Sequence, residues 1–148
     1  MNNLLFLCTG NYYRSRFCEE YFNHLASRHA LAWRARSRGL APDITVFRNP
    51  GPLSPHTYQG LNALGVVLEA TLRDPLSVQS SDWVKAQHII ALSRVEHEPM
   101  VERFFPSYAP VVEYWEVGDL PVASPTEALS RMAGAVHELI NRLHQRSS

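Results

Sequence analysis

Short apolar runs alternate along this chain with longer segments in which apolar residues recur every three or four positions. Such runs are typical of buried strands, and such spacing is typical of helices with one buried face. The pattern predicts strands at Leu4–Cys8, Trp33–Ser37, His88–Leu92 and Val111–Trp115. It predicts helices at Ser15–His29, Pro55–Leu64, Arg94–Phe105 and Thr126–His144. This alternation favours an α/β fold, with a parallel sheet and helices on both of its faces.

The first and last predicted helices each carry a clear apolar stripe. In the first, the expected inward residues are Phe17, Tyr21, Phe22 and Leu25. In the last, they are Leu129, Met132, Ala133, Val136, Leu139, Ile140 and Leu143. Residues 38–55 break the pattern with four prolines and two glycines, so we expect a loop that forms one wall of a substrate cleft.

Length and charge favour one enzyme domain over residues 1–148. Fourteen Lys and Arg balance fourteen Asp and Glu, so net charge indicates neither a nucleic-acid partner nor an anionic membrane. The first apolar run is far shorter than a signal-peptide core, and no run approaches membrane-spanning length. Two cysteines are too few for a disulfide framework. We therefore expect a cytoplasmic protein.

Residues 8–15, Cys-Thr-Gly-Asn-Tyr-Tyr-Arg-Ser, join the first predicted strand to the first predicted helix. We call this segment the phosphate loop. A chain that curls before a helix turns backbone N–H groups inward, and the helix N-terminus adds positive potential, so the segment favours anion binding. Gly10 and Asn11 tolerate the backbone angles of such a tight turn.

Three side chains of the phosphate loop indicate phosphoryl chemistry. The planar guanidinium of Arg14 can hold two oxygens of a tetrahedral anion at once. Cys8 lies beneath that anion, where the helix N-terminus and the arginine favour a nucleophilic thiolate, and the Ser15 hydroxyl can donate to it. A buried cysteine is more often a small core residue. The strand, the turn residues and the helix together favour the functional interpretation.

A general acid is expected near the carboxyl end of the fourth strand, in the segment Glu116–Pro121. In parallel sheets, ligands bind at the carboxyl ends of the strands, so this segment faces the phosphate loop. Asp119 is our candidate to protonate the departing oxygen. The alternative is an ordinary loop aspartate that precedes a turn.

With these motifs the chain resembles the low-molecular-weight protein tyrosine phosphatases over nearly its whole length. The phosphate loop at the extreme N-terminus, Ser37-Arg38-Gly39 after the second strand, and Trp115…Asp119 before the last helix carry the resemblance. It implies a four-stranded parallel sheet in the order 2-1-3-4. It also implies a two-step mechanism on a phosphorylated protein, without metal or cofactor.

The resemblance further implies a role for each motif residue. Cys8 would attack phosphorus, Arg14 and the loop amides would hold the equatorial oxygens, and Asp119 would act as acid and then as base. Asn11 and Ser15 would hold the loop in shape, with Ser37 as a supporting partner. The remaining phosphate-binding positions are Thr9, Gly10, Tyr12 and Tyr13.

This sequence departs from the family at several positions. A supporting histidine that the family often has after the second helix aligns with Thr71 or Leu72. The second cysteine of the loop is replaced by Tyr13, and we expect Cys18 to be a core residue, which leaves Cys8 poorly protected from oxidation. Tyr12 stands where tyrosine phosphatases usually have an aliphatic residue and arginine phosphatases a threonine.

The predicted acid loop departs as well. Leu120 separates Asp119 from Pro121, and an aromatic residue of the family's rim is absent. Phe47 or Tyr12 is a candidate to replace it as a stacking surface.

Several functions stay open on this evidence. Hydrolysis of phosphotyrosine in proteins leads, with phosphoarginine as a variant of the same chemistry. A catalytically weak phosphate-binding regulatory module is the second class. Arsenate reduction with thioredoxin calls for two further cysteines, and none follows Cys18. The seven histidines show no metal-ligand spacing, and we expect most of them at the surface or at helix ends.

Overall fold

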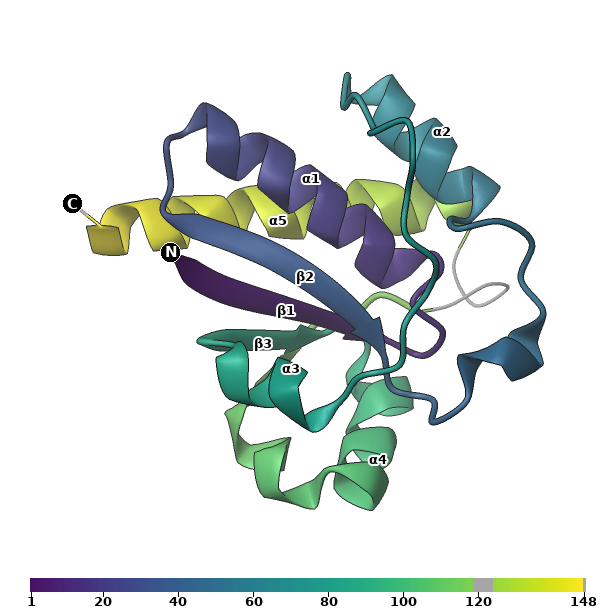
Figure 1. Cartoon of the computed structure of the whole chain (residues 1–148). Coiled ribbons are helices and arrows are strands. Elements are labelled where there is room, and N and C mark those ends of the chain that lie inside the picture. The colour runs from purple at the N-terminus through teal and green to yellow at the C-terminus, as the bar shows by residue number, and fades with distance from the viewer. Residues whose placement is uncertain (119–123, 148) are drawn as a thin grey trace.

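The computed structural model describes residues 1–118 and 124–147 (Figure 1). Its sheet consists of β1 (Asn2–Cys8), β2 (Trp33–Gly39), β3 (His88–Ala91) and β4 (Val112–Tyr114). All three strand pairs are parallel, and the order is β2-β1-β3-β4. The predicted fold class and strand order are therefore confirmed.

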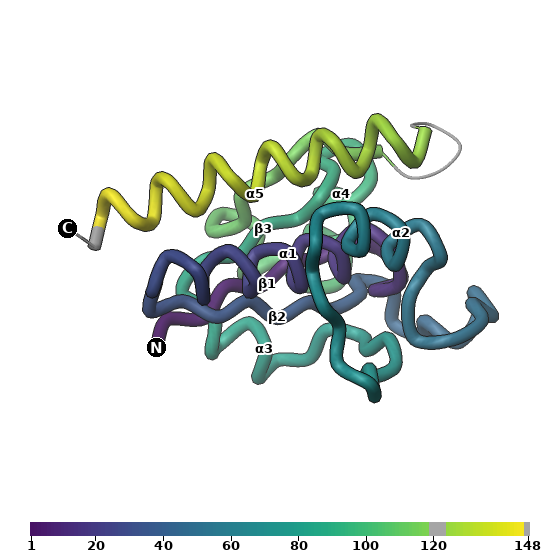
Figure 2. Tube along the Cα trace, turned by 90° about the horizontal axis from the view of Figure 1, so that it is seen from above, coloured from purple at the N-terminus to yellow at the C-terminus, as the bar shows by residue number. Residues whose placement is uncertain are grey.

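Helices cover both faces of this sheet (Figures 1 and 2). One face carries α1 (Arg14–Arg28), α2 (Pro55–Ala63) and α5 (Pro125–Ser147). The other carries α3 (Ser80–Lys85) and α4 (Arg94–Phe104). Two short 3-10 helices, η1 (Ile44–Phe47) and η2 (Pro106–Val111), complete the elements.

β1 is a continuous apolar run because it lies inside the sheet and is covered on both faces. Leu4 and Phe6 enter the core beneath α1 and α5, whereas Leu5 and Leu7 enter the core beneath α3 and α4. All four side chains are at most 2% exposed. A strand buried on both faces needs apolar residues at successive positions, as this sequence has.

The apolar stripes of α1 and α5 meet over the sheet as predicted. Phe17, Tyr21, Phe22 and Leu25 are all buried. In α5, the buried members of the stripe are Met132, Val136, Leu139, Ile140 and Leu143, and Leu129 and Ala133 pack at its margin.

Helix α3 was not predicted, and the fourth strand is shorter than predicted. α3 has six residues, fewer than two turns, so no apolar period can show in its sequence. It begins with a capping box in which the Asp82 carboxylate accepts from the Gln79 N–H at 2.8 Å. Val111 ends η2 instead of beginning β4.

The carboxyl ends of β1 and β2 bring two distant segments of the chain together. Cys8 pairs with Gly39 at the end of β2, and the pairing continues beyond the strands, because Leu40 N–H donates to Cys8 O at 2.8 Å.

No helix among the described residues is both long and apolar enough to cross a membrane.

Candidate active site

Two backbone carbonyl groups of the phosphate loop accept hydrogen bonds from the segment that follows β2. The carbonyl oxygens of Thr9 and Tyr12 accept from Ala41 N–H at 3.1 Å and Ser54 N–H at 3.0 Å. By contrast, within the described parts of the chain no protein acceptor is found for the N–H groups of residues 9–12. Consecutive N–H donors without protein acceptors, directly before a helix, form a binding site for an anion.

Cys8 and Asn11 occupy the inside of this turn. The Cys8 side chain is 3% exposed, and its Sγ lies 2.9 Å from Ser15 Oγ. Asn11 has a φ of 54°, a left-handed conformation that asparagine tolerates better than most residues. Its Nδ2 donates to Ser15 Oγ and to Ser37 Oγ, each at 2.9 Å. The structure thus brings Cys8, Asn11, Ser15 and Ser37 together as a bonded group.

Arg14 begins α1 and is held by a residue that the sequence reasoning missed. The Glu96 carboxylate accepts from both terminal nitrogens of Arg14, at 2.8 and 2.9 Å, and Val117 O accepts from Nη1 at 2.9 Å. Thr9 Oγ1 donates to the same carboxylate at 2.6 Å. Glu96 therefore fixes the plane of the guanidinium, which is only 2% exposed. A single glutamate 82 residues away gives no sequence signal for this contact.

The electrostatics around Glu96 follow from this geometry. Burial raises the pKa of its carboxyl, but the hydrogen bonds from Arg14 and Thr9 outweigh burial and bring the pKa below its usual value. Burial and the nearby Arg14 charge lower the pKa of His97 to about 4. Its Nδ1 accepts from Ser93 N–H at 3.0 Å, which also requires a ring nitrogen without a proton. His97 is thus a buried neutral side chain, unlike the surface or capping position expected for most histidines.

The support expected from a histidine near Thr71 or Leu72 comes instead from Arg73. Its Nη1 donates to Asn11 Oδ1 at 2.9 Å, and its Nη2 donates to Ser37 Oγ at 3.0 Å. Arg73 was missed because it falls next to the aligned positions and is a different residue type.

A cavity of about 320 Å³ opens above Cys8. It is lined by the phosphate loop together with Phe47, Asn49 and Ser54, so residues 38–55 form its wall as predicted. Tyr12 O–H donates to Pro50 O at 2.6 Å and ties that wall to the phosphate loop. Phe47 lies against Gly10, where a Cβ would come within 3.3 Å of its ring.

Tyr13 and Cys18 both reach into the core. Tyr13 is 7% exposed, and its carbonyl oxygen accepts from Thr57 Oγ1 at 3.0 Å. Cys18 is fully buried, as expected, and both cysteines are free thiols. Burial, and secondarily the Cys8 thiol, raise the pKa of Cys18 well above its usual value.

The candidate acid Asp119 lies outside the described residues. Val117, two residues before Asp119, contacts the site. Its N–H donates to Leu92 O at 2.7 Å, and its carbonyl oxygen accepts from Arg14. Asp74 and Glu116, the alternatives if Asp119 is not the acid, are exposed. The described residues contain no group of three His, Cys, Asp or Glu side chains placed to hold a metal ion.

Comparison with known proteins gives the fold. No protein-family model matches the sequence, and no curated protein matches it. Among solved structures, YfkJ from Bacillus subtilis is similar with a TM-score of 0.82 and 18% identity, over 100% of this chain and 98% of that one. A low-molecular-weight protein tyrosine phosphatase from T. tengcongensis has a TM-score of 0.74 and 24% identity, over 99% of each chain.

A third solved structure, the YwlE arginine phosphatase from Geobacillus stearothermophilus, has a TM-score of 0.71 and 19% identity, over 99% of this chain and 92% of that one. The chain therefore has the fold of the low-molecular-weight protein tyrosine phosphatases, and the resemblance found in its motifs is confirmed at the level of the fold.

Proposed function

We propose that this protein is a cysteine-dependent phosphatase that hydrolyses phosphotyrosine in proteins through a phosphocysteine intermediate. The observation that carries the proposal is the arrangement of the phosphate loop. Four consecutive N–H groups, at residues 9–12, have no protein acceptor within the described chain, and they directly follow a cysteine whose sulfur lies 2.9 Å from Ser15 Oγ. This is a cradle for a tetrahedral anion with a nucleophile beneath it.

In the first step, Cys8 Sγ forms a bond to phosphorus and the ester P–O bond breaks. Asp119 gives its proton to the departing oxygen. Arg14 and the loop N–H groups stabilise the three equatorial oxygens, and donors of this kind contribute about 3–4 kcal/mol each in other enzymes.

In the second step, a water molecule attacks phosphorus while Asp119 takes one of its protons. The P–S bond breaks, inorganic phosphate leaves, and the Cys8 thiolate is restored. Ser15 supports the thiolate as a hydrogen-bond donor, and Asn11 and Ser37 keep Ser15 in place.

The cavity walls support an aromatic substrate group. Tyr12 and Phe47 both line the cavity that contains Cys8, and an aryl ring between them would be bound by stacking. Phosphoarginine is the alternative substrate, since a planar guanidinium also stacks on aromatic rings. Arginine phosphatase is the activity named for the structurally similar YwlE.

We also propose that residues 1–148 act as a single domain in the cytoplasm on phosphorylated protein substrates. The two apolar cores lie on opposite faces of one sheet, which supports a single unit. The balanced charge supports a partner that is neither a nucleic acid nor a membrane.

Hydrolysis of para-nitrophenyl phosphate tests the enzyme class. Wild type is expected to be active, Cys8→Ser to be inactive, and Asp119→Ala to be slower on esters with poor leaving groups. Cys18→Ala is the matched control, because it removes the other thiol without touching the cavity. Phosphotyrosine and phosphoarginine peptides then separate the two substrates. Activity in wild type no higher than in Cys8→Ser would instead support a phosphate-binding regulatory module.

A further inference from the structure

β2 carries three arginines at alternate positions, Arg34, Arg36 and Arg38, which we call the arginine row. Side chains alternate between the two faces of a strand, so the three arginines share one face. Ala35 enters the core beneath α1, so the arginine row faces the side of α3. There Arg38 Nε lies 3.3 Å from Asp82 Oδ1. Arg34 and Arg36 are exposed, and within the described parts of the chain they form no ion pair.

The outer backbone edge of β2 is occupied by other parts of the protein. Asn23 from α1 accepts from Ala35 N–H at 2.7 Å and donates to Ala35 O at 3.1 Å. Gly39 N–H donates to Leu76 O, and Gly39 O accepts from Val78 N–H, each at 2.8 Å. A partner strand cannot pair with β2 at these positions without displacing those bonds. A partner at this edge would therefore be recognised by the arginine side chains.

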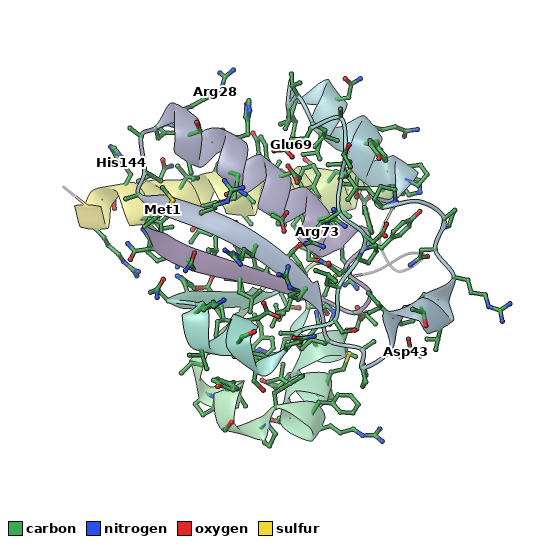
Figure 3. All side chains as sticks on the ribbon, in the orientation of Figure 1. Met1, Arg28, Asp43, Glu69, Arg73 and His144 are labelled. Atoms are coloured by element: carbon green, nitrogen blue, oxygen red, sulfur yellow. The ribbon has the colours of Figure 1, made fainter. Side chains whose placement is uncertain are left out.

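A cavity of about 570 Å³ is lined by the whole arginine row. Glu20 from α1 and Glu69 line it as well, and neither carboxylate forms an ion pair among the described residues. Figure 3 shows Glu69 and Arg73 on the segment that passes from α2 across α1 to the end of β2. The cavity thus has unpaired cations on β2 and unpaired anions on its other side. The remaining charged lining residues all have hydrogen-bond partners in the protein: Arg16, Glu19 and Arg73.

We propose that the arginine row is a docking site for an acidic segment of the protein substrate. A guanidinium group binds a carboxylate through two N–H donors at once. Alternate residues of an extended chain are roughly 6–7 Å apart, so two carboxylates of such a segment match the spacing of Arg34 and Arg36. This inference rests on the proposed function, in which the substrate is a phosphorylated protein.

The arginine row leads toward the phosphate loop. β2 ends at Gly39, which pairs with Cys8, and the chain then continues into the wall of the cavity above Cys8. Arg34 precedes Gly39 by five residues, or about 17 Å of strand. A substrate that reaches both sites would therefore carry its acidic residues about five to ten positions from the phosphorylated residue.

A nucleic acid fits this surface less well than an acidic protein segment. Nucleic-acid affinity comes from many phosphate contacts, whereas the row offers two unpaired arginines and shares its cavity with Glu20 and Glu69. A polypeptide can place neutral or basic side chains beside these carboxylates while its acidic residues lie on β2. A nucleic acid carries a negative charge at every nucleotide.

Binding of a fluorescent, unphosphorylated peptide of alternating glutamate and serine tests the docking site. Wild type is expected to bind it, more weakly as salt rises, because exposed charges are screened. Arg34→Gln combined with Arg36→Gln is expected to weaken binding about tenfold. Glu69→Gln is expected to tighten binding about twofold, because it removes a repulsive charge.

The matched control is Arg28→Gln combined with Arg103→Gln. It removes the same charge from exposed positions on α1 and α4, and binding should change less than about twofold. Equal weakening in the two double variants would overturn the inference, because net charge alone would then explain the binding. A single-stranded RNA that binds more tightly than the peptide, and is lost in the Arg34 and Arg36 variant, would also overturn it.

Kinetics connect the docking site to the proposed function. One phosphotyrosine peptide carries glutamates five to ten positions away on both sides, and a second carries serines there. In wild type the acidic peptide is expected to have a KM about tenfold lower with the same kcat, and in the Arg34 and Arg36 variant the two KM values should be equal. Hydrolysis of para-nitrophenyl phosphate should not change in that variant, because neither arginine lines the cavity above Cys8.

These measurements separate the docking site from the proposed function. Peptide binding needs no turnover, so arginine-dependent binding by a protein that hydrolyses neither substrate would refute the enzyme and keep the docking site. Hydrolysis of both phosphotyrosine peptides with one KM would refute the docking site and keep the enzyme.

Discussion

Gly39 lies where β2 comes closest to the phosphate loop. A Cβ at this position would be 2.8 Å from Thr9 O and 3.2 Å from the carbonyl carbon of Gly10, and backbone atoms cannot move aside cheaply. We expect Gly39→Ala to destabilise the protein by about 2–3 kcal/mol and to reduce activity, because the phosphate loop has to shift.

Urea unfolding measures the loss in Gly39→Ala, with Gly134→Ala as the control. A Cβ at Gly134 meets nothing within 4 Å, and the residue is exposed within α5. That variant should gain about 0.5–1 kcal/mol from the better helix propensity of alanine. Equal effects of the two substitutions would contradict the close packing at Gly39.

The protonation of His97 makes the free energy of unfolding depend on pH. Its pKa is about 4 in the folded protein, against about 6.5 in an unfolded chain, so the unfolded state takes up the proton first as the pH falls. The free energy of unfolding should therefore fall by about 2 kcal/mol between pH 6.5 and 4.5 on account of this residue. In His97→Gln this part of the slope should be absent, as measured by urea unfolding at several pH values. An identical slope in the two proteins would show that the pKa of His97 is not lowered in the fold.

The site residues that were predicted from the sequence lie close together in the chain, whereas those that were missed lie far from them. Cys8, Arg14 and Ser15 belong to one short segment, so their spacing and residue types could be recognised directly. Arg73 and Glu96 reach the same segment from 62 and 82 residues away, and only the folded chain brings them there.

At the scale of elements, α3 closes one face of the sheet through a single large side chain. Trp83 is 2% exposed and stacks on Tyr108 with the ring centroids 4.8 Å apart. Trp83→Ala should cost about 3–5 kcal/mol, because it removes the main apolar contact of this short helix. Its neighbour Val84 is 72% exposed, and Val84→Ala should change little. Thermal unfolding compares the two, and a small effect of Trp83→Ala would mean that α3 contributes little to the core.

The sequence predicted long elements better than short ones for a physical reason. β1 and α5 carry enough apolar residues to display a run or a period, and both were predicted. The six-residue α3 and the 3-10 turns carry too few, and η2 took over the start of the predicted fourth strand.

At the scale of the whole molecule, the site and the chain ends are separated. The start of β1 and the end of α5 lie at one end of the sheet, and the phosphate loop lies at the other (Figures 1 and 2). The parallel arrangement brings the carboxyl ends of all four strands to that other end. The cavity above Cys8 therefore lies at the end of the sheet away from the start of β1 and the end of α5.

In the proposed mechanism, Cys8 carries the phosphoryl group during turnover. Asp119→Ala should accumulate this intermediate with para-nitrophenyl phosphate, because it lacks the base that activates water for the second step. After rapid quenching and trypsin digestion, peptide 1–14 should carry one added phosphoryl group on Cys8, and the same peptide from Cys8→Ala should carry none. The mechanism would be contradicted if wild type releases para-nitrophenol while the phosphoryl group is found on another residue, or on none, in both wild type and Asp119→Ala.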